Sequence, residues 1–410
     1  MTFPDEFWWG TIASATQTEG ASSASDWFRW EESGRAPRSK TGNGFTQRFD
    51  EDFQLLASFG LTHHQLSLDW SRLEPEPERH DLAAIEHYRA ILTAAADHGI
   101  SVWASLHHFA LPGWFSENEG GFVDDRARSY VWPRHVDWVA ETFGDLLFGW
   151  VPIYQPGVFV ERGWHARLGP PNLADPEQHA LALRATHLAN FEAWRLLRSG
   201  DQPVMTIHDL SPVEPGVKSR HPDELDAARL ATAQADHLTW SWTRALRDGV
   251  LEIPGLPPRE IDDLAGSFDV IGFSYSGART IYAEGEVGPY PADIRLDDTG
   301  IGPWTEGLGI TIRRLADELP GRKYVVAGLG VGTSDDRWRT DVLRDALSEI
   351  ESALADGYDI AGMFHHTGID SYQWERGFDT QFGLFDQDRT PRASAELVKS
   401  WAAKPPNMTS

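Results

Sequence analysis

Four residues with the chemistry to move a proton or orient a hydroxyl group, His108, His366, Asp209 and Gln155, each stand just after a short β-rich run. Histidine titrates close to neutral pH and is the commonest general acid or base in enzymes. Glutamine cannot exchange protons, but its amide orients a hydroxyl or carbonyl group. The four residues therefore predict acid–base chemistry on a polyhydroxylated or carbonyl-bearing small molecule.

A histidine also precedes each of His108, His366 and Asp209. Adjacent residues of a strand point to opposite faces, so one member of each pair can face a common site. For the same reason the two side chains of a pair cannot bind one ion, and the pairs predict no metal site.

Eight β-rich runs alternate with eight stretches of helical periodicity, and this alternation predicts a single (β/α)8 TIM barrel of the α/β class. The β-rich runs are 8–15, 61–68, 100–106, 148–153, 204–208, 268–273, 322–326 and 360–364. The helical stretches are 50–59, 82–98, 125–143, 176–198, 222–247, 307–319, 334–355 and 393–402. No linker or repeat divides the chain, so we expect one domain over residues 1–410.

A barrel of this kind carries its chemistry at the carboxyl ends of its strands. We therefore expect the site among the residues that follow the eight β-rich runs. In chain order these are Gln17 and Glu19; Asp69 and Trp70; His107 and His108; Tyr154 and Gln155; His208 and Asp209; Ser274 and Tyr275; Gly328; and His365, His366 and Asp370.

The composition restricts partners and location. Asp plus Glu outnumber Lys plus Arg by 62 to 36, which gives a net charge of −26 and disfavours nucleic acid and anionic membranes as partners. The absence of cysteine excludes disulfides, Fe–S clusters and a cysteine nucleophile. No segment has the pattern of a signal peptide or membrane span, so we expect a cytoplasmic protein. The bias of 31 Arg over 5 Lys favours a bacterial source.

Long segments of the chain resemble glycoside hydrolase family 1, the β-glucosidase family. Among them are FPDEFWWGTIASATQTEGA at the start, HGISVWASLHHFALPGWF around the third strand and DGYDIAGMFHHTGIDSYQWERGFDTQFGLFDQD near the end. The resemblance implies a retaining glycosidase without a cofactor, whose ligand is a glycoside-like small molecule. It places sugar-binding residues of the family at Gln17, His108 and Trp374, and a polar family position at Asp209.

The resemblance fails at the residues that carry the family's mechanism. Retaining hydrolysis needs one carboxyl group as acid/base and another as nucleophile. The acid/base triplet Asn-Glu-Pro corresponds to Tyr154-Gln155-Pro156, and the nucleophile position of Thr-Glu-Asn-Gly corresponds to Gly328. Three further family residues are replaced: the second-strand Arg by Gln65, the eighth-strand Trp by His366 and a sugar-binding Glu by Gln373.

These departures leave three functions open. The first is a non-hydrolytic enzyme that eliminates water, or cyclises or isomerises a hydroxylated natural product or sugar, with His108, His366, Asp209 and Gln155 at the reacting atoms. The second is a non-catalytic carbohydrate-binding pseudoglycosidase. The third is a β-glycosidase with a substrate-assisted mechanism. In each case we expect the ligand to contact Gln17, Gln65, Tyr154, Tyr275, Gly328, Gln373 and Trp374. The sequence does not determine the oligomeric state.

Overall fold

The computed structural model describes residues 3–218 and 222–403, and it confirms the (β/α)8 barrel. Residues 1–2, 219–221 and 404–410 of the predicted domain lie outside the described residues. The barrel strands are β1 (Trp8–Ala13), β2 (His63–Ser67), β3 (Ser101–His107), β4 (Gly149–Ile153), β5 (Met205–Asp209), β9 (Val270–Tyr275), β12 (Lys323–Leu329) and β13 (Ile360–His366). Each predicted β-rich run therefore contains or overlaps a barrel strand.

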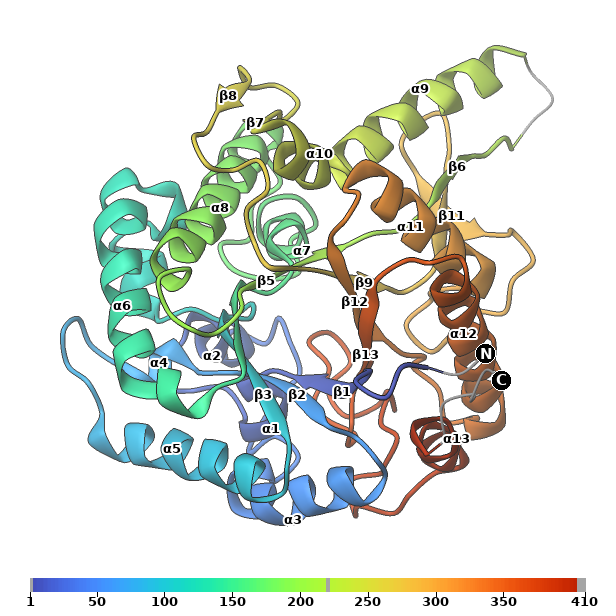
Figure 1. Cartoon of the computed structure of the whole chain (residues 1–410). Helices are drawn as coiled ribbons and strands as arrows, with labels where there is room; N and C mark the ends of the chain where they lie inside the picture. Colours follow the sequence, from blue (N-terminus) through green and yellow to red (C-terminus); the bar gives the residue numbers. More distant parts are fainter. Residues whose placement is uncertain (1–2, 219–221, 404–410) are drawn as a thin grey trace.

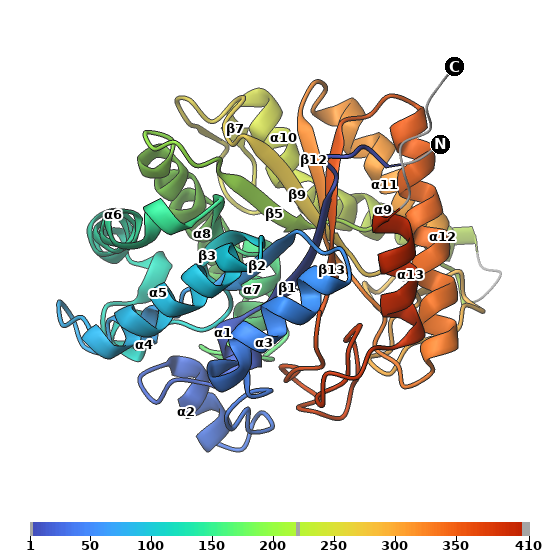
Figure 2. The ribbon, with the colours of Figure 1, turned by 60° about the horizontal axis from the view of Figure 1, so that its bottom comes forward.

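The eight strands are parallel and follow the order β4-β3-β2-β1-β13-β12-β9-β5. Single parallel bridges from Trp150 to Val204 and from Tyr154 to Ile207 join the two end strands, so the barrel is nearly closed. Figures 1 and 2 show the helices arranged around the outside of this sheet.

The outer layer follows the predicted periodicity closely. Its helices are α3 (Phe45–Ser58), α5 (Leu82–Asp97), α6 (Trp132–Phe143), α8 (Pro176–Leu197), α9 (Pro222–Thr239), α10 (Ser241–Asp248), α11 (Thr305–Glu318), α12 (Asp336–Ala355) and α13 (Ala393–Ala402). The stretch 222–247, expected as one helix, is interrupted at Trp240, which leaves the helical conformation and is buried.

The connections between the barrel strands and the outer helices contain further short elements. Short helices are α1 (Ala15–Glu19), α2 (Asp26–Glu32), α4 (Trp70–Leu73) and α7 (Pro156–Val160); the π-helices are η1 (Trp114–Asn118), η3 (Ala127–Val131) and η5 (Glu161–His165); and the 3-10 helices are η2 (Gly121–Val123) and η4 (Gly144–Leu146). A small sheet joins β6 (Val213–Pro215), β10 (Ala278–Ile281) and β11 (Val287–Tyr290), and β7 (Val250–Leu251) pairs with β8 (Arg259–Glu260). Apart from η3, which lies within the predicted helical stretch 125–143, periodicity did not predict these elements, because they are too short to have a measurable hydrophobic period.

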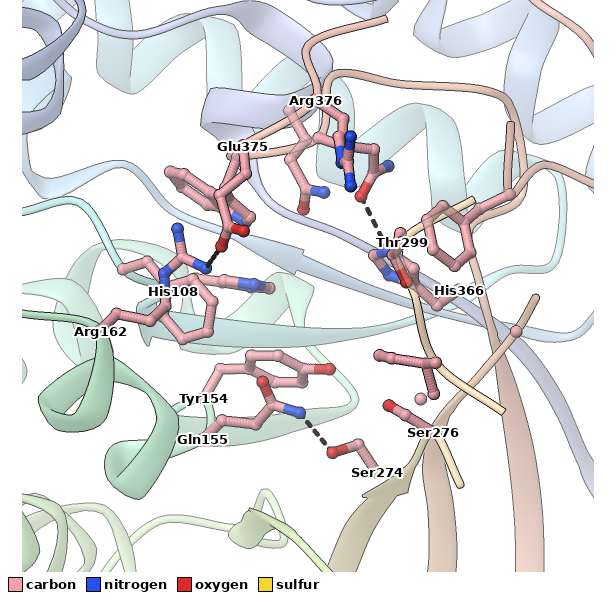
Figure 3. Close-up of a pocket in the computed structure, with 18 of the residues that line it drawn as sticks. His108, Tyr154, Gln155, Arg162, Ser274, Ser276, Thr299, His366, Glu375 and Arg376 are labelled. Atoms are coloured by element: carbon pink, nitrogen blue, oxygen red, sulfur yellow. Dashed lines mark hydrogen bonds and ion pairs between the residues drawn. The ribbon is translucent and has the colours of Figure 1, made fainter. Parts of the chain in front are cut away.

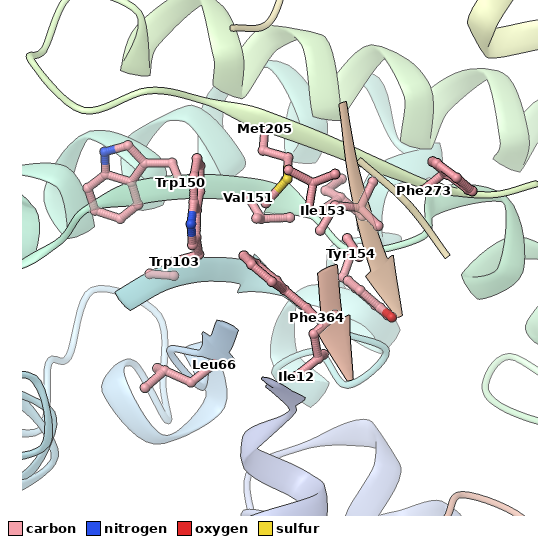
Figure 4. Close-up of a cluster of buried hydrophobic side chains, with 14 of the residues drawn as sticks. Ile12, Leu66, Trp103, Trp150, Val151, Ile153, Tyr154, Met205, Phe273 and Phe364 are labelled. Atoms are coloured by element: carbon pink, nitrogen blue, oxygen red, sulfur yellow. The ribbon is translucent and has the colours of Figure 1, made fainter. Parts of the chain in front are cut away.

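Large aromatic side chains fill the barrel interior, among them Trp103 and Phe364 in the buried cluster of Figure 4. Glycines on neighbouring strands make room for them. A Cβ at Gly10 would lie 2.3 Å from the Phe364 ring, and one at Gly149 would lie 2.4 Å from the Trp103 ring. The interior below the site is therefore a packed core and not a channel.

None of the described helices is long and apolar enough to span a lipid bilayer.

Candidate active site

A cavity of about 310 Å³ lies at the carboxyl ends of the barrel strands, where the fold predicts the site. Nine of the eleven predicted residues line it: His108, His366, Gln155, Gln17, Tyr154, Tyr275, Gly328, Gln373 and Trp374. Figure 3 shows several of these side chains together with Arg162, Ser274, Thr299 and Glu375. The structure thus brings together residues that are up to 357 positions apart, from Gln17 to Trp374.

One wall of the cavity consists of flat rings. His108, which follows β3, stacks on Tyr154, which follows β4, with ring centroids 4.1 Å apart and planes 22° apart. Trp374 lies beyond His108 at 6.3 Å and 28°, and the edge of Trp27 supports it at 4.7 Å and 89°. Such a wall suits the apolar face of a sugar-like ring or an aromatic substituent.

Amide and imidazole groups form a second part of the lining. His366 Nε2 lies 3.3 Å from Gln373 Oε1, so the neutral imidazole donates to this amide in its Nε2–H tautomer. Gln17 is completely buried: its Nε2 donates to the Tyr372 carbonyl at 3.1 Å and its Oε1 accepts from Ser14, within the cap of α1. The side-chain amide of Gln17 is therefore engaged within the protein.

The imidazoles of the cavity are uncharged at neutral pH. Burial lowers the pKa of His366 to about 4, although the hydrogen bond with Gln373 opposes the change. Burial also lowers the pKa of His108 well below its ordinary value, and the neighbouring His107 and His366 add to the effect. At pH 7 both rings accept or donate hydrogen bonds, whereas an imidazolium acid is disfavoured.

A chain of hydrogen bonds crosses the floor of the cavity. Gln155 Nε2 donates to Ser274 Oγ, and Ser274 Oγ donates to Asp209 Oδ1 at 3.2 Å. Asp209 does not line the cavity; it lies behind Ser274 and faces Arg279 at 3.8 Å. Burial raises the pKa of Asp209, while Arg279 and Ser274 oppose the increase. Ser274 is therefore the group that connects this predicted residue to the cavity.

Gln65 also lies outside the cavity lining. It is fully buried in β2, and its Nε2 donates to Ser105 Oγ on β3 at 2.8 Å. Gln65 is therefore part of the barrel wall, and the predicted contact with a ligand in the cavity is not favoured by this position.

Gly328 occupies an irregular point of β12, where the pairing register with both neighbouring strands shifts. Its φ of +131° is one that residues with a side chain rarely adopt. A Cβ at this position would lie 2.9 Å from the Ser274 Cβ and 3.1 Å from the Tyr154 hydroxyl. The backbone and its neighbours both favour glycine here.

Of the charged groups at the rim, Glu375 and Arg162 are paired with each other and Asp297 is held by the backbone. Glu375 Oε1 binds Arg162 Nη1 at 2.5 Å. Asp297 accepts hydrogen bonds from the backbone amides of Thr299, Ile301 and Gly332. These two are the carboxylates among the lining residues, with Arg162 and Arg376 as the cations, so the formal charges cancel.

Sequence reasoning did not assign chemistry to Ser274, Arg162 or Glu375. The sequence places Ser274 at a strand end, but its role in the hydrogen-bond chain depends on Gln155 and Asp209, which follow or end two other strands. Arg162 and Glu375 are 213 residues apart in two irregular connections, and no local pattern marks such a pair.

Comparison with known proteins identifies the family. The family model "Glycosyl hydrolase family 1" matches residues 1–404. The coniferin beta-glucosidase of Pinus contorta is 25% identical over 97% of this chain and 91% of its own length. The thermostable beta-glucosidase B of Thermobispora bispora is 24% identical over 96% of this chain and 89% of its own.

Solved structures agree with this result. A beta-glycosidase from Pyrococcus horikoshii superimposes with a TM-score of 0.88 and 26% identity, over 98% of this chain and 95% of its own. A family 1 β-glucosidase from Thermotoga maritima, in complex with isofagomine lactam, has the same fold with a TM-score of 0.86 and 18% identity, over 97% and 98% of the two chains. The family model covers residues 1–404 of this chain, and the cavity lies at the strand ends of a (β/α)8 barrel. The chain belongs to glycosyl hydrolase family 1.

Proposed function

We propose that the cavity binds a neutral, polyhydroxylated small molecule of the glycoside type, and that the protein does not hydrolyse it by the retaining mechanism. The observation that carries the proposal is the pair Gln155 and Gly328. Both line the same cavity, at the ends of the two strands where the family resemblance places the acid/base and the nucleophile. The Gln155 amide cannot protonate a leaving group, and Gly328 has no side chain to attack an anomeric carbon.

The rest of the lining supports a neutral ligand. The floor consists of amide and hydroxyl groups, the imidazoles are uncharged at neutral pH, and the rim charges cancel. Hydroxyl groups can satisfy amides and imidazoles in both directions, whereas an ionised ligand finds no unmatched counter-charge at the floor. The ring wall of His108, Tyr154 and Trp374 provides the apolar contact.

Calorimetric titration with methyl and phenyl β-glycosides at pH 7.5 tests the binding function. We expect saturable heat, and a Trp374→Ala variant should lose at least about tenfold in affinity because it removes a large aromatic contact. Trp338→Ala on α12, where the indole stacks with Arg295 outside the cavity, is the matched control and should bind as the unchanged protein does.

The absence of heat for every glycoside, with the protein folded, would contradict this proposal. Equal affinity of the Trp374→Ala and Trp338→Ala variants would mean that the ligand binds elsewhere.

Elimination of water is a second candidate function, and the hydrogen bond from Ser274 to Asp209 favours it. A base is needed to take a proton from the bound molecule, and the Asp209 carboxylate can receive it through the Ser274 hydroxyl. The departing hydroxyl would take its proton from His366 or His108, although burial disfavours the imidazolium form of both at pH 7. Cyclisation and isomerisation would use the same groups.

Mass spectrometry of incubated hydroxylated candidates tests the elimination, through a product lighter by one water. We expect Ser274→Ala to lower its rate by about 10²-fold or more, the usual contribution of a positioned acid or base, while affinity changes little. Product formation that survives both Ser274→Ala and the pair of His366→Ala and His108→Ala would remove the assigned groups from the reaction.

The cytoplasmic location and bacterial source remain predictions from the sequence.

A further inference from the structure

Two histidines and a glutamate meet on the outer side of the connection that follows β4. Glu161 and His165 are the first and last residues of the π-helix η5, and His179 is in the first turns of α8. One potential ligand atom from each of the three side chains lies within 4.8 Å of the others. In the part of the chain that the structure describes, this is the group whose geometry could hold a metal ion.

Two of the three separations match those of a tetrahedral site. Zn²⁺ binds histidine nitrogen and carboxylate oxygen at about 2.0–2.2 Å, which places neighbouring ligand atoms about 3.3–3.6 Å apart. His179 Nε2 lies 3.3 Å from Glu161 Oε2, and His165 Nδ1 lies 3.6 Å from the same oxygen. The second separation is too long for a hydrogen bond but suits two ligands of one ion.

We propose that Glu161, His165 and His179 form a binding site for Zn²⁺ or a divalent ion of similar ligand preference, with its fourth position open to water. Two imidazoles with one carboxylate are a ligand set typical of zinc, whereas Ca²⁺ and Mg²⁺ prefer oxygen ligands. The adjacent histidine pairs of the barrel strands are not involved, so the proposal does not alter the prediction for those pairs.

The surroundings allow a cation. Arg162, the next residue, is already paired with Glu375. Exposure of the His165 side chain, 68%, gives an ion access from solvent. The chain's net charge of −26 raises the local concentration of cations.

The site would also join two elements that belong to different parts of the connection. Residues 166–175 separate η5 from α8, and a bound ion would fasten their ends together. Metal binding to the folded chain alone raises its stability by mass action, so the ion should be detectable without any knowledge of the enzyme's substrate.

Calorimetric titration of chelator-treated, untagged protein with ZnCl₂ at pH 7.5 tests the proposal. We expect one site per chain, a rise in the thermal midpoint on adding Zn²⁺, and no response to MgCl₂ or CaCl₂. His165→Ala and His179→Ala should each lose more than about tenfold in Zn²⁺ affinity, because loss of an outer partner of a ligand alone costs 10–100-fold.

His98→Ala is the matched control. His98 Nε2 binds Asp50 Oδ1 at 3.0 Å, so it offers the same histidine–carboxylate pair without a third ligand nearby, and its loss should leave Zn²⁺ binding unchanged. The proposal is overturned if the unchanged protein gives no saturable heat with Zn²⁺. It is equally overturned if the double variant of His165 and His179 binds as tightly as the His98→Ala control, in which case the three side chains are an ion-pair cluster and nothing more.

Discussion

Between pH 7.5 and pH 4.5 the free energy of unfolding is expected to fall steeply, by several kcal/mol. Eight of the described histidines are buried and His366 is partly buried, and desolvation is the main cause of a lowered pKa in all nine. In the unfolded chain these imidazoles have a pKa of about 6.5. In the folded protein the pKa of His63, His64 and His366 is about 4. The unfolded state therefore binds more protons over this interval, and stability decreases as pH falls.

Buried carboxyl groups with a raised pKa oppose this effect, most clearly Asp26, whose pKa burial raises to about 7. Each proton that the unfolded chain binds in excess of the folded chain lowers the free energy of unfolding by about 1.4 kcal/mol per pH unit. The free energy of unfolding of a typical domain is only about 5–15 kcal/mol. Denaturant titrations at a series of pH values should show the protein unfolding before pH 4.

His135→Phe is the matched variant for this prediction. The His135 ring stacks on Trp70 at 4.1 Å, and neither of its nitrogens has a hydrogen-bond partner within the described chain. Phenylalanine keeps the stacking and removes one titrating group, so the slope of stability against pH should decrease by about 1.4 kcal/mol per unit. A free energy of unfolding that stays constant from pH 7.5 to 5 would show that the buried histidines do not control acid stability.

Placing a carboxylate at position 328 is expected to abolish ligand binding and to destabilise the fold. Gly328→Glu places a side chain at a φ of +131°, with its Cβ 2.9 Å from that of Ser274. The backbone strain alone costs about 1–3 kcal/mol, and the remainder of the side chain fills the cavity between Tyr154 and Ser274. We expect Gly328→Ala to lower the free energy of unfolding because of the backbone strain. Gly328→Glu should in addition lose ligand binding, and it should not gain hydrolytic activity.

Two further variants separate the causes. Gly157→Ala on α7 adds a Cβ into open space, so it should change stability little or raise it slightly. Gly328→Ala combined with Ser274→Gly removes the Cβ–Cβ contact but keeps the unfavourable φ, and it should recover part of the lost stability. Unchanged stability and binding in Gly328→Ala would show that the space at this position is larger than the structure indicates.

The sequence predicted the barrel because most strands and helices are long enough to reveal their hydrophobic period, and because the alternation of strands and helices is compatible with few architectures. It also predicted nine of the lining residues, since residues at the carboxyl ends of parallel strands meet at one face. Asp209 and Gln65 show the limit. Which side of a strand end faces the cavity depends on the twist of the barrel and on a neighbouring side chain, Ser274 in one case and Ser105 in the other. Pairs such as Arg162 and Glu375 depend on irregular connections and carry no local signal.

We expect this family 1 protein to bind a glycoside-like molecule without forming a covalent glycosyl intermediate. The test is incubation with a panel of aryl β-glycosides, including a slow-reacting 2-fluoro glycoside, followed by intact-protein mass spectrometry and detection of the released aryl alcohol. We predict that the protein mass stays unchanged and that no aryl alcohol is released above the buffer rate, although the glycosides bind. A glycosyl adduct on the chain, or steady turnover by the unchanged protein, would show that binding without hydrolysis is wrong for this protein.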